Sequence, residues 1–141
     1  MSFYLDTSVV VPLFVKEVHS AVANYWLQAE ERALFFGKLV IGEFNSTLSR
    51  LVRQGEIAQS EAATVRSSAR NWLETAATQI EHLDLDIEAA AAMVVAPFPK
   101  LLMPDAIHIA TCKRLGLKFV TFDLDLVIIA AREGVTATSP I

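Results

Sequence analysis

The sequence lacks most of what marks a disulfide-rich, membrane-spanning or secreted protein. It contains one cysteine, Cys112, which excludes an intramolecular disulfide and suits a reducing compartment such as the cytoplasm. No apolar run approaches the ~18 residues of a transmembrane helix, because the most apolar stretch, 89–99, is short and contains two prolines. The first residues include neither a basic region nor a cleavable apolar segment, so we expect no signal peptide and no membrane association.

A surplus of basic residues is also missing. The 141 residues include 12 Lys and Arg against 16 Asp and Glu, for a net charge of −4. Broad electrostatic binding of nucleic acid depends on basic surface that displaces counterions. The charge therefore argues against that mode of binding, and an enzyme acting on nucleic acid would need local basic patches and a metal ion.

Apolar residues, in contrast, are abundant. They make up 53% of the chain, which favours either a parallel sheet buried on both faces or a surface covered by a partner. A chain of this length is expected to form one domain, 1–141, with a core of its own.

Short apolar segments alternate with amphipathic ones along the chain. We expect strands at 3–6, 33–36, 79–85, 118–122 and 135–138. We expect helices at 20–31, 38–53, 58–78, 86–96, 104–115 and 124–132. A further helix follows the first strand, capped by Thr7 or Ser8, and Pro12 either opens that helix or marks a tighter first turn. This alternation predicts an α/β fold with three layers, α/β/α, and a mostly parallel central sheet.

Four acidic residues stand where apolar segments end or turn: Asp6, Glu43, Asp105 and Asp123. Asp6 and Asp123 follow predicted strands, and the carboxyl ends of parallel strands form the usual ligand-binding edge of such a sheet. Glu43 lies beside the apolar stripe of helix 38–53, and Asp105 lies in the first turn of its helix. The fold could therefore bring the four carboxylates together.

Each acid also has an ordinary structural interpretation. Asp105 could stabilise its helix dipole by ~0.3–1 kcal/mol, Asp6 and Asp123 could form turns, and Glu43 could pair with Arg50. Gathered in one place, however, carboxylates ~5 Å apart would repel by roughly 3 kcal/mol per pair at an effective dielectric near 20. Such a cluster needs a cation or protons, and oxygen ligands alone select Mg²⁺ or Mn²⁺.

The strings around these acids resemble the PIN-domain family, and within it the VapC toxins of bacterial toxin–antitoxin pairs. The resemblance runs from residue 3 to about residue 135 and is carried by Tyr4-Leu5-Asp6-Thr7-Ser8, Ile41-Gly42-Glu43-Phe44, Pro104-Asp105-Ala106-Ile107-His108-Ile109-Ala110-Thr111 and Phe119-Val120-Thr121-Phe122-Asp123. It implies that Asp6, Glu43, Asp105 and Asp123 are the catalytic and metal-binding residues, with Asp6 and Asp105 as the principal ligands. It also implies that three hydroxyls hydrogen-bond the acids or a metal-bound water: Thr7, Ser8 and Thr121.

The same resemblance implies a function. Such proteins are Mg²⁺- or Mn²⁺-dependent endoribonucleases that are held inactive by a cognate antitoxin and commonly form homodimers. Metal-activated water would attack the RNA phosphodiester and leave a 5′-phosphate and a 3′-hydroxyl. The alternative is a PIN-like domain that binds or processes RNA outside a toxin–antitoxin pair, with a vestigial site. Asp125 stands close to Asp123, and either could complete the site.

Several other polar residues are interpreted as structural. His108 and Asp105 share a helix face and could bind a transition metal, but the remaining ligands are oxygens and the resembling family has an apolar-facing histidine here. His19 and His82 have no partner in the sequence. The basic residues Arg50, Arg53, Arg66 and Arg70 are expected on solvated faces, where some could hold phosphate. Helices 38–53 and 58–78 offer a candidate surface for a dimer or an antitoxin.

Overall fold

A parallel sheet forms the centre of the molecule. The computed structural model describes residues 1–29 and 31–141. Among these, the strands are β1 (Ser2–Leu5), β2 (Ala33–Gly37), β3 (Thr78–Ile80), β4 (Lys118–Val120) and β5 (Ala137–Thr138), in the order β3-β2-β1-β4-β5. All four neighbouring pairs run parallel. The predicted α/β class with a mostly parallel sheet is confirmed.

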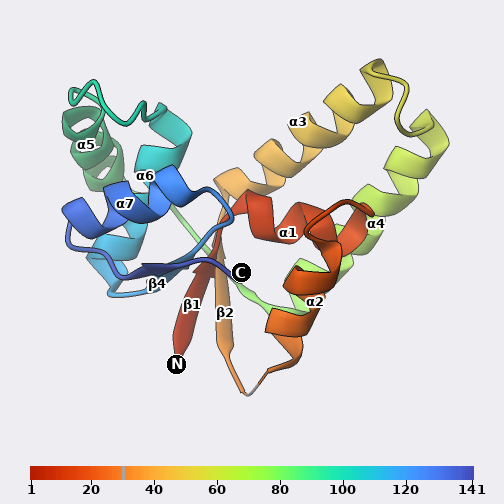
Figure 1. Cartoon of the computed structure of the whole chain (residues 1–141), viewed down its shortest axis with the longest axis horizontal. Coiled ribbons are helices and arrows are strands. Elements are labelled where there is room, and N and C mark those ends of the chain that lie inside the picture. Colours follow the sequence, from red (N-terminus) through yellow and green to blue (C-terminus); the bar gives the residue numbers. More distant parts are fainter. Residues whose placement is uncertain (30) are drawn as a thin grey trace.

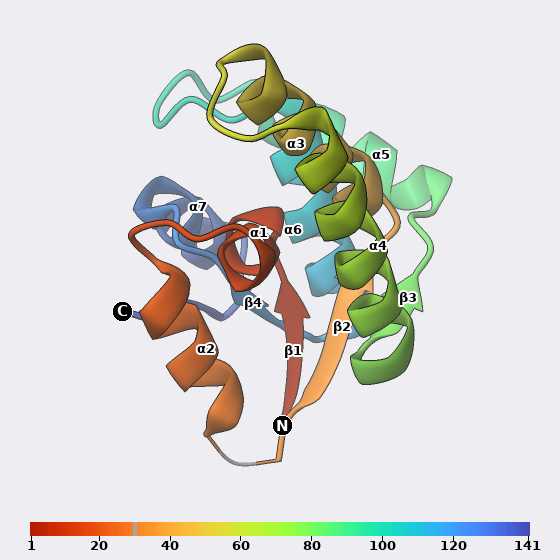
Figure 2. The ribbon, with the colours of Figure 1, turned by 90° about the vertical axis from the view of Figure 1, so that its right-hand side faces the viewer.

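Helices cover both faces of this sheet, and Figure 1 shows the resulting three layers. One face carries α1 (Thr7–Phe14), α2 (Ser20–Gln28), α3 (Leu39–Arg53) and α4 (Gln59–Ala76). The other carries α5 (Asp84–Met93), α6 (Met103–Leu115) and α7 (Leu124–Arg132). Figure 2 shows α3 and α4 as an antiparallel pair beside β2. No helix in the described part of the chain is long and apolar enough to cross a membrane.

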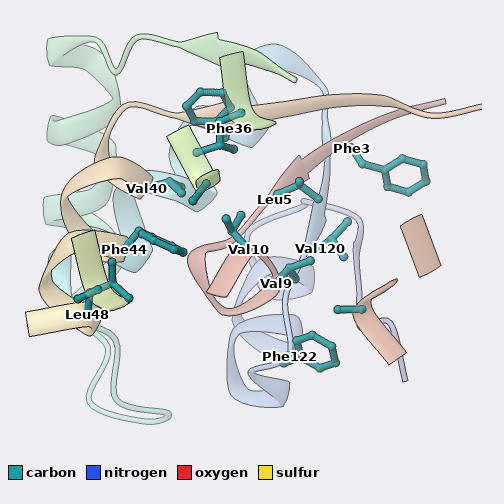
Figure 3. Packing of buried hydrophobic residues seen from close by; sticks show 14 residues of the cluster. Phe3, Leu5, Val9, Val10, Phe36, Val40, Phe44, Leu48, Val120 and Phe122 are labelled. Atoms are coloured by element: carbon teal, nitrogen blue, oxygen red, sulfur yellow. The ribbon is translucent and has the colours of Figure 1, made fainter. Parts of the chain in front are cut away.

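The core is divided between the two faces because successive strand residues point to opposite sides. Phe3 and Leu5 belong to the cluster on the side of α1–α4 (Figure 3), where Phe3 packs edge-on against Trp26 of α2, whereas Tyr4 packs with α6 and α7 on the other side. In β4, Phe119 joins Tyr4 and Val120 joins Leu5. Burial on both faces explains why the central strands are continuously apolar.

The strand order reverses at β1. The chain runs from β1 outward to β2 and β3, then returns to the other side of β1 as β4 and β5. The backbone N–H of Asp6 donates to the Val120 carbonyl at 2.9 Å, so the ends of β1 and β4 lie side by side. A reversal of this kind opens a ligand crevice at the carboxyl ends of the strands.

Two local predictions were wrong. The strand predicted at 79–85 ends at Ile80, and α5 starts at Asp84 instead of residue 86. The reason is a tertiary contact: buried Asp86 accepts the Leu83 N–H at 2.9 Å while its carboxylate pairs with Arg114. The predicted helix 20–31 ends at Gln28, and residue 30 lies outside the described residues.

The start of α1 also differs from the prediction. Asp6 is the N-cap, so Thr7 and Ser8 lie inside the helix, and Pro12 is near its end rather than in its first turn. The hydroxyls of Thr7 and Ser8 do not cap the helix but donate to Glu43 and Asp6. The first turn of α1 therefore supplies side chains to the crevice above β1.

Candidate active site

A pocket of about 610 Å³ opens at the carboxyl edge of the sheet. Its lining includes all four predicted acids: Asp6, Glu43, Asp105 and Asp123. They come from the end of β1, from α3, from the first turn of α6 and from the residue before α7. Asp125 is not among the described lining residues, so Asp123 is the acid that this fold brings to the others.

Asp6 is held from one side only. Its side chain is nearly buried, with 5% of the residue exposed. Atom Oδ2 accepts the hydroxyls of Ser8 at 2.7 Å and Thr121 at 2.8 Å. Among the described residues no hydrogen bond reaches Oδ1. One oxygen is thus fixed by two hydroxyls, and the other remains available for a ligand.

Glu43 shows the same one-sided arrangement. Atom Oε1 accepts the Thr7 hydroxyl at 3.0 Å and the His108 Nε2–H at 2.5 Å, and Oε2 receives no hydrogen bond from a described residue. Burial alone would raise the pKa of Glu43, but the hydrogen bonds from His108 and Thr7 outweigh it and lower that pKa. Glu43 therefore stays ionised, and its partner is His108 rather than the Arg50 weighed from the sequence.

His108 is not an apolar-facing residue, although it is fully buried. Its Nδ1 bonds to the hydroxyl of Tyr4, which is also fully buried. Burial, followed by the charges of Cys112, Asp6 and Glu43, raises the pKa of Tyr4, so this phenol keeps its proton. Nothing in the sequence pattern links residues 4, 43 and 108, and sequence reasoning missed the contact.

Asp105 and Asp123 differ in their surroundings. Burial, then the charges of Asp6 and Glu43, raises the pKa of Asp105 to about 6. The contributions of Asp6 and Glu43 are the mutual repulsion expected of clustered carboxylates, and they add to the larger effect of burial. Asp123 is exposed and caps α7 by accepting the N–H groups of Asp125 at 3.0 Å and Leu126 at 3.4 Å. Asp123 therefore both caps α7 and lines the pocket.

The pocket suits a hard cation in chemistry and in charge. Its acidic ligands offer only oxygen, which Mg²⁺ and Mn²⁺ prefer. The pKa of Asp105 is raised first by burial and then by the negative charges of Asp6 and Glu43, both of which a bound cation would offset. Among the described residues, however, no three Asp, Glu, His or Cys side chains lie close enough together to hold a metal ion. The carboxylates would have to draw together around a bound ion.

The rim of the pocket adds an aromatic pair and a basic residue. The His19 ring lies parallel to that of Phe122, with centroids 4.1 Å apart and planes within 1°. Both residues line the pocket, as does exposed Arg50 on α3. His19 was interpreted as structural, because residues 19 and 122 are far apart in the chain and no local signal connects them. His82 does have structural partners, Thr111 and the Leu39 N–H.

Solved structures of the same fold include several toxins. The chain resembles VapC20 of Mycobacterium tuberculosis, described as a toxin that cleaves the sarcin–ricin loop, at 19% identity and a TM-score of 0.71, covering 89% of this chain and 93% of that one. It resembles VapBC2 of Rickettsia felis, bound to a promoter DNA fragment, at 13% identity and a TM-score of 0.70, covering 99% and 98%. A toxin–antitoxin complex from Klebsiella pneumoniae matches at 19% identity and a TM-score of 0.67, covering 98% and 97%.

These identities are low, so the likeness to solved structures establishes the fold. No curated protein matches the chain significantly. The sequence profile of the PIN domain matches residues 3–132, a span that contains all four pocket acids and both halves of the sheet up to the end of α7. The chain therefore belongs to the PIN domain family.

Proposed function

We propose that this chain is a metal-dependent endoribonuclease toxin of a toxin–antitoxin pair. The observation that carries the proposal is the convergence of Asp6, Glu43, Asp105 and Asp123 on one pocket at the carboxyl edge of a PIN domain sheet. The toxins among the similar structures support the same activity, one of them being described as a toxin that cleaves the sarcin–ricin loop.

The four acids are proposed to hold Mg²⁺ or Mn²⁺, with Asp6 and Asp105 as the principal ligands. The bound ion would supply an activated water and offset charge at the scissile phosphate. The hydroxyls of Ser8 and Thr121 keep Asp6 in place, and that of Thr7 keeps Glu43 in place. The products of such hydrolysis are a 5′-phosphate and a 3′-hydroxyl.

The rim of the pocket suits an unpaired RNA strand. Arg50 is a basic side chain available for a phosphate on the α3 side. The half-exposed ring of His19, backed by Phe122, offers an aromatic surface on which a base can stack. Together they would supply contacts that the acidic pocket itself cannot make with a polyanion.

A cognate antitoxin and a second copy of the chain are the proposed protein partners. Similar structures include complexes of toxins with antitoxins. A basic antitoxin residue in the pocket would neutralise the same carboxylates as the cation, so antitoxin and metal should compete for the pocket. The cytoplasm is the proposed location, since the free thiol of Cys112 suits a reducing compartment.

Loss of a pocket carboxylate tests the proposal. We expect wild-type protein to cleave single-stranded RNA in Mg²⁺ or Mn²⁺ and Asp6→Asn to abolish cleavage without unfolding, because the amide keeps hydrogen-bonding capacity but removes a charged ligand. Asp125→Asn is the matched control, since Asp125 lies nearby in sequence but outside the described pocket lining. RNA binding by wild-type protein without cleavage in either metal would favour the alternative, a PIN domain with a vestigial site outside a toxin–antitoxin pair.

A further inference from the structure

A buried line of hydrogen bonds lies behind Glu43. It runs from the Tyr4 hydroxyl to Nδ1 of His108, and from Nε2 of His108 to Oε1 of Glu43 at 2.5 Å. The three side chains come from β1, α6 and α3, and both Tyr4 and His108 are 0% exposed. Glu43 is the one member that reaches the surface, with 28% of its side chain exposed.

The chemistry of the three side chains determines which group donates and which accepts in each of these hydrogen bonds. An ionised carboxylate only accepts hydrogen bonds, so Nε2 of His108 must carry the hydrogen that Glu43 receives. In the neutral imidazole Nδ1 then accepts, and the Tyr4 hydroxyl is its donor. Tyr4 thus selects the tautomer of His108 that can donate to Glu43.

The imidazole also has little freedom to turn. The ring of His82 packs edge-on against that of His108, with centroids 5.7 Å apart. Gly37 lies above the Tyr4 hydroxyl, where any side chain would overlap both Tyr4 and His82. Because the His108 ring cannot turn freely, its Nε2–H points in one direction, and Glu43 Oε1 must lie along that direction to accept the hydrogen bond.

The consequence for Glu43 is a defined orientation of a long side chain. Thr7 donates to the same oxygen, Oε1, so both hydrogen bonds leave Oε2 without a bond from any described residue. Removing a group that orients a metal ligand in this way typically lowers metal affinity or activity by about 10–100-fold.

We propose that His108 is a positioning residue, which holds Glu43 so that its second oxygen is presented to the pocket, and that Tyr4 fixes the orientation of His108. The role of Glu43 in binding a metal ion rests on the proposed function, but the placement of Glu43 by His108 does not. The rival interpretation is a structural pair that stabilises the fold and leaves the position of Glu43 unaffected.

Two amide substitutions at position 108 separate these interpretations. The amide nitrogen of glutamine falls near the Nε2 position of histidine and can donate to Glu43, whereas that of asparagine falls near Nδ1 and cannot. His108→Gln and His108→Asn therefore bury similar polar groups but differ in reach.

The first measurement is the position of Glu43 in crystal structures of the metal-free proteins. We expect the wild-type position in His108→Gln, and a displaced or multiply placed Glu43 in His108→Asn. The second is Mn²⁺ affinity by calorimetry without RNA, which we expect to fall by about 10-fold or more in His108→Asn and to stay within about 3-fold in His108→Gln.

The outcomes keep the two proposals apart. A Glu43 that stays in place in His108→Asn overturns the positioning role, whatever the activity, as does equal loss of Mn²⁺ affinity in both amide variants with Glu43 unmoved. A Glu43 displaced only in His108→Asn supports the role even if the wild-type protein cleaves no RNA, and in that case only the proposed ribonuclease activity fails.

Discussion

At the scale of single residues, the pocket acids are held by neutral donors rather than by cations. Asp6 is bonded by Ser8 and Thr121, and Glu43 by Thr7 and a histidine. No lysine or arginine forms an ion pair with any of the four acids among the described residues. No basic side chain among these residues therefore offsets their negative charge, and the charges of Asp6 and Glu43 add to burial in raising the pKa of Asp105.

Asp105 should make the metal-free protein less stable as the pH rises. Its pKa is raised from 3.8 to about 6 in the folded state. Between these values the folded state binds more protons than the unfolded state, so the free energy of unfolding falls with increasing pH. We expect Asp105→Asn to be more stable than wild type by about 1–2 kcal/mol near pH 7.5, allowing for solvent screening, with the gap closing toward about pH 4.

Thermal or urea unfolding in buffer with a chelator measures this gap. Asp125→Asn serves as the control, since it removes one acid of the same type outside the described pocket lining. An Asp105→Asn variant whose stability gain did not change with pH would show that the effect is unrelated to ionisation of Asp105.

At the scale of elements, the residue type at the end of β2 is restricted by the side chains of Tyr4 and His82, which pack against it. Gly37 is its last residue, and a side chain there would overlap the Tyr4 hydroxyl and the His82 ring. The glycine is thus required by close approach of side chains rather than by an unusual backbone angle. By contrast, Gly42 lies within α3 with nothing near its missing side chain.

Two glycine-to-alanine substitutions should therefore have opposite effects. Gly37→Ala forces buried groups apart and should destabilise the protein by about 1–3 kcal/mol. Gly42→Ala fills open space in a helix and should stabilise it by about 0.5–1 kcal/mol. Urea unfolding of both variants measures the difference. Equal stability of Gly37→Ala and wild type would contradict the close packing of Tyr4 and His82 beneath β2.

At the scale of the whole molecule, the exposed large apolar side chains lie away from the predicted partner surface. Helices α3 and α4 expose none of them, although their sequences were the candidate dimer or antitoxin surface. Several lie instead on α5 and the segment after it: Leu85, Ile87, Val95, Phe98 and Leu102. The α5 side is therefore the better candidate for contact between two copies of the chain.

Mass measurement in solution tests the proposed homodimer. We expect twice the 15.5 kDa chain mass at tens of micromolar. Phe98→Glu should shift the protein to monomer, because Phe98 is 83% exposed and a charge buried there would be costly. Tyr25→Glu is the control, because Tyr25 is an aromatic residue on α2 that is similarly exposed, at 77%. A monomeric wild type, or a dimer unaffected by Phe98→Glu, would contradict this arrangement.

The sequence by itself determined the fold class, most element positions and the four acids that share the pocket. These follow from short-range patterns, since strand and helix periodicity is local and the carboxyl ends of parallel strands meet at one edge. Repulsion was expected from the sequence if the fold gathered the acids, and the charges of Asp6 and Glu43 do contribute, after burial, to the raised pKa of Asp105. The catalytic and metal-binding roles of the acids, and a single domain spanning 1–141, stay predictions.

Only the tertiary structure decided which atoms hold each acid and which residues complete the pocket. His108 meets Glu43 across 65 positions and Tyr4 across 104, and a contact at such separation leaves no local pattern. The choice of Asp123 over Asp125 depended on how α7 begins, and the start of α5 on the pairing of Asp86 with Arg114. In each case a hydrogen bond or ion pair between distant segments outweighed a weak local preference, which is why the sequence left these details open.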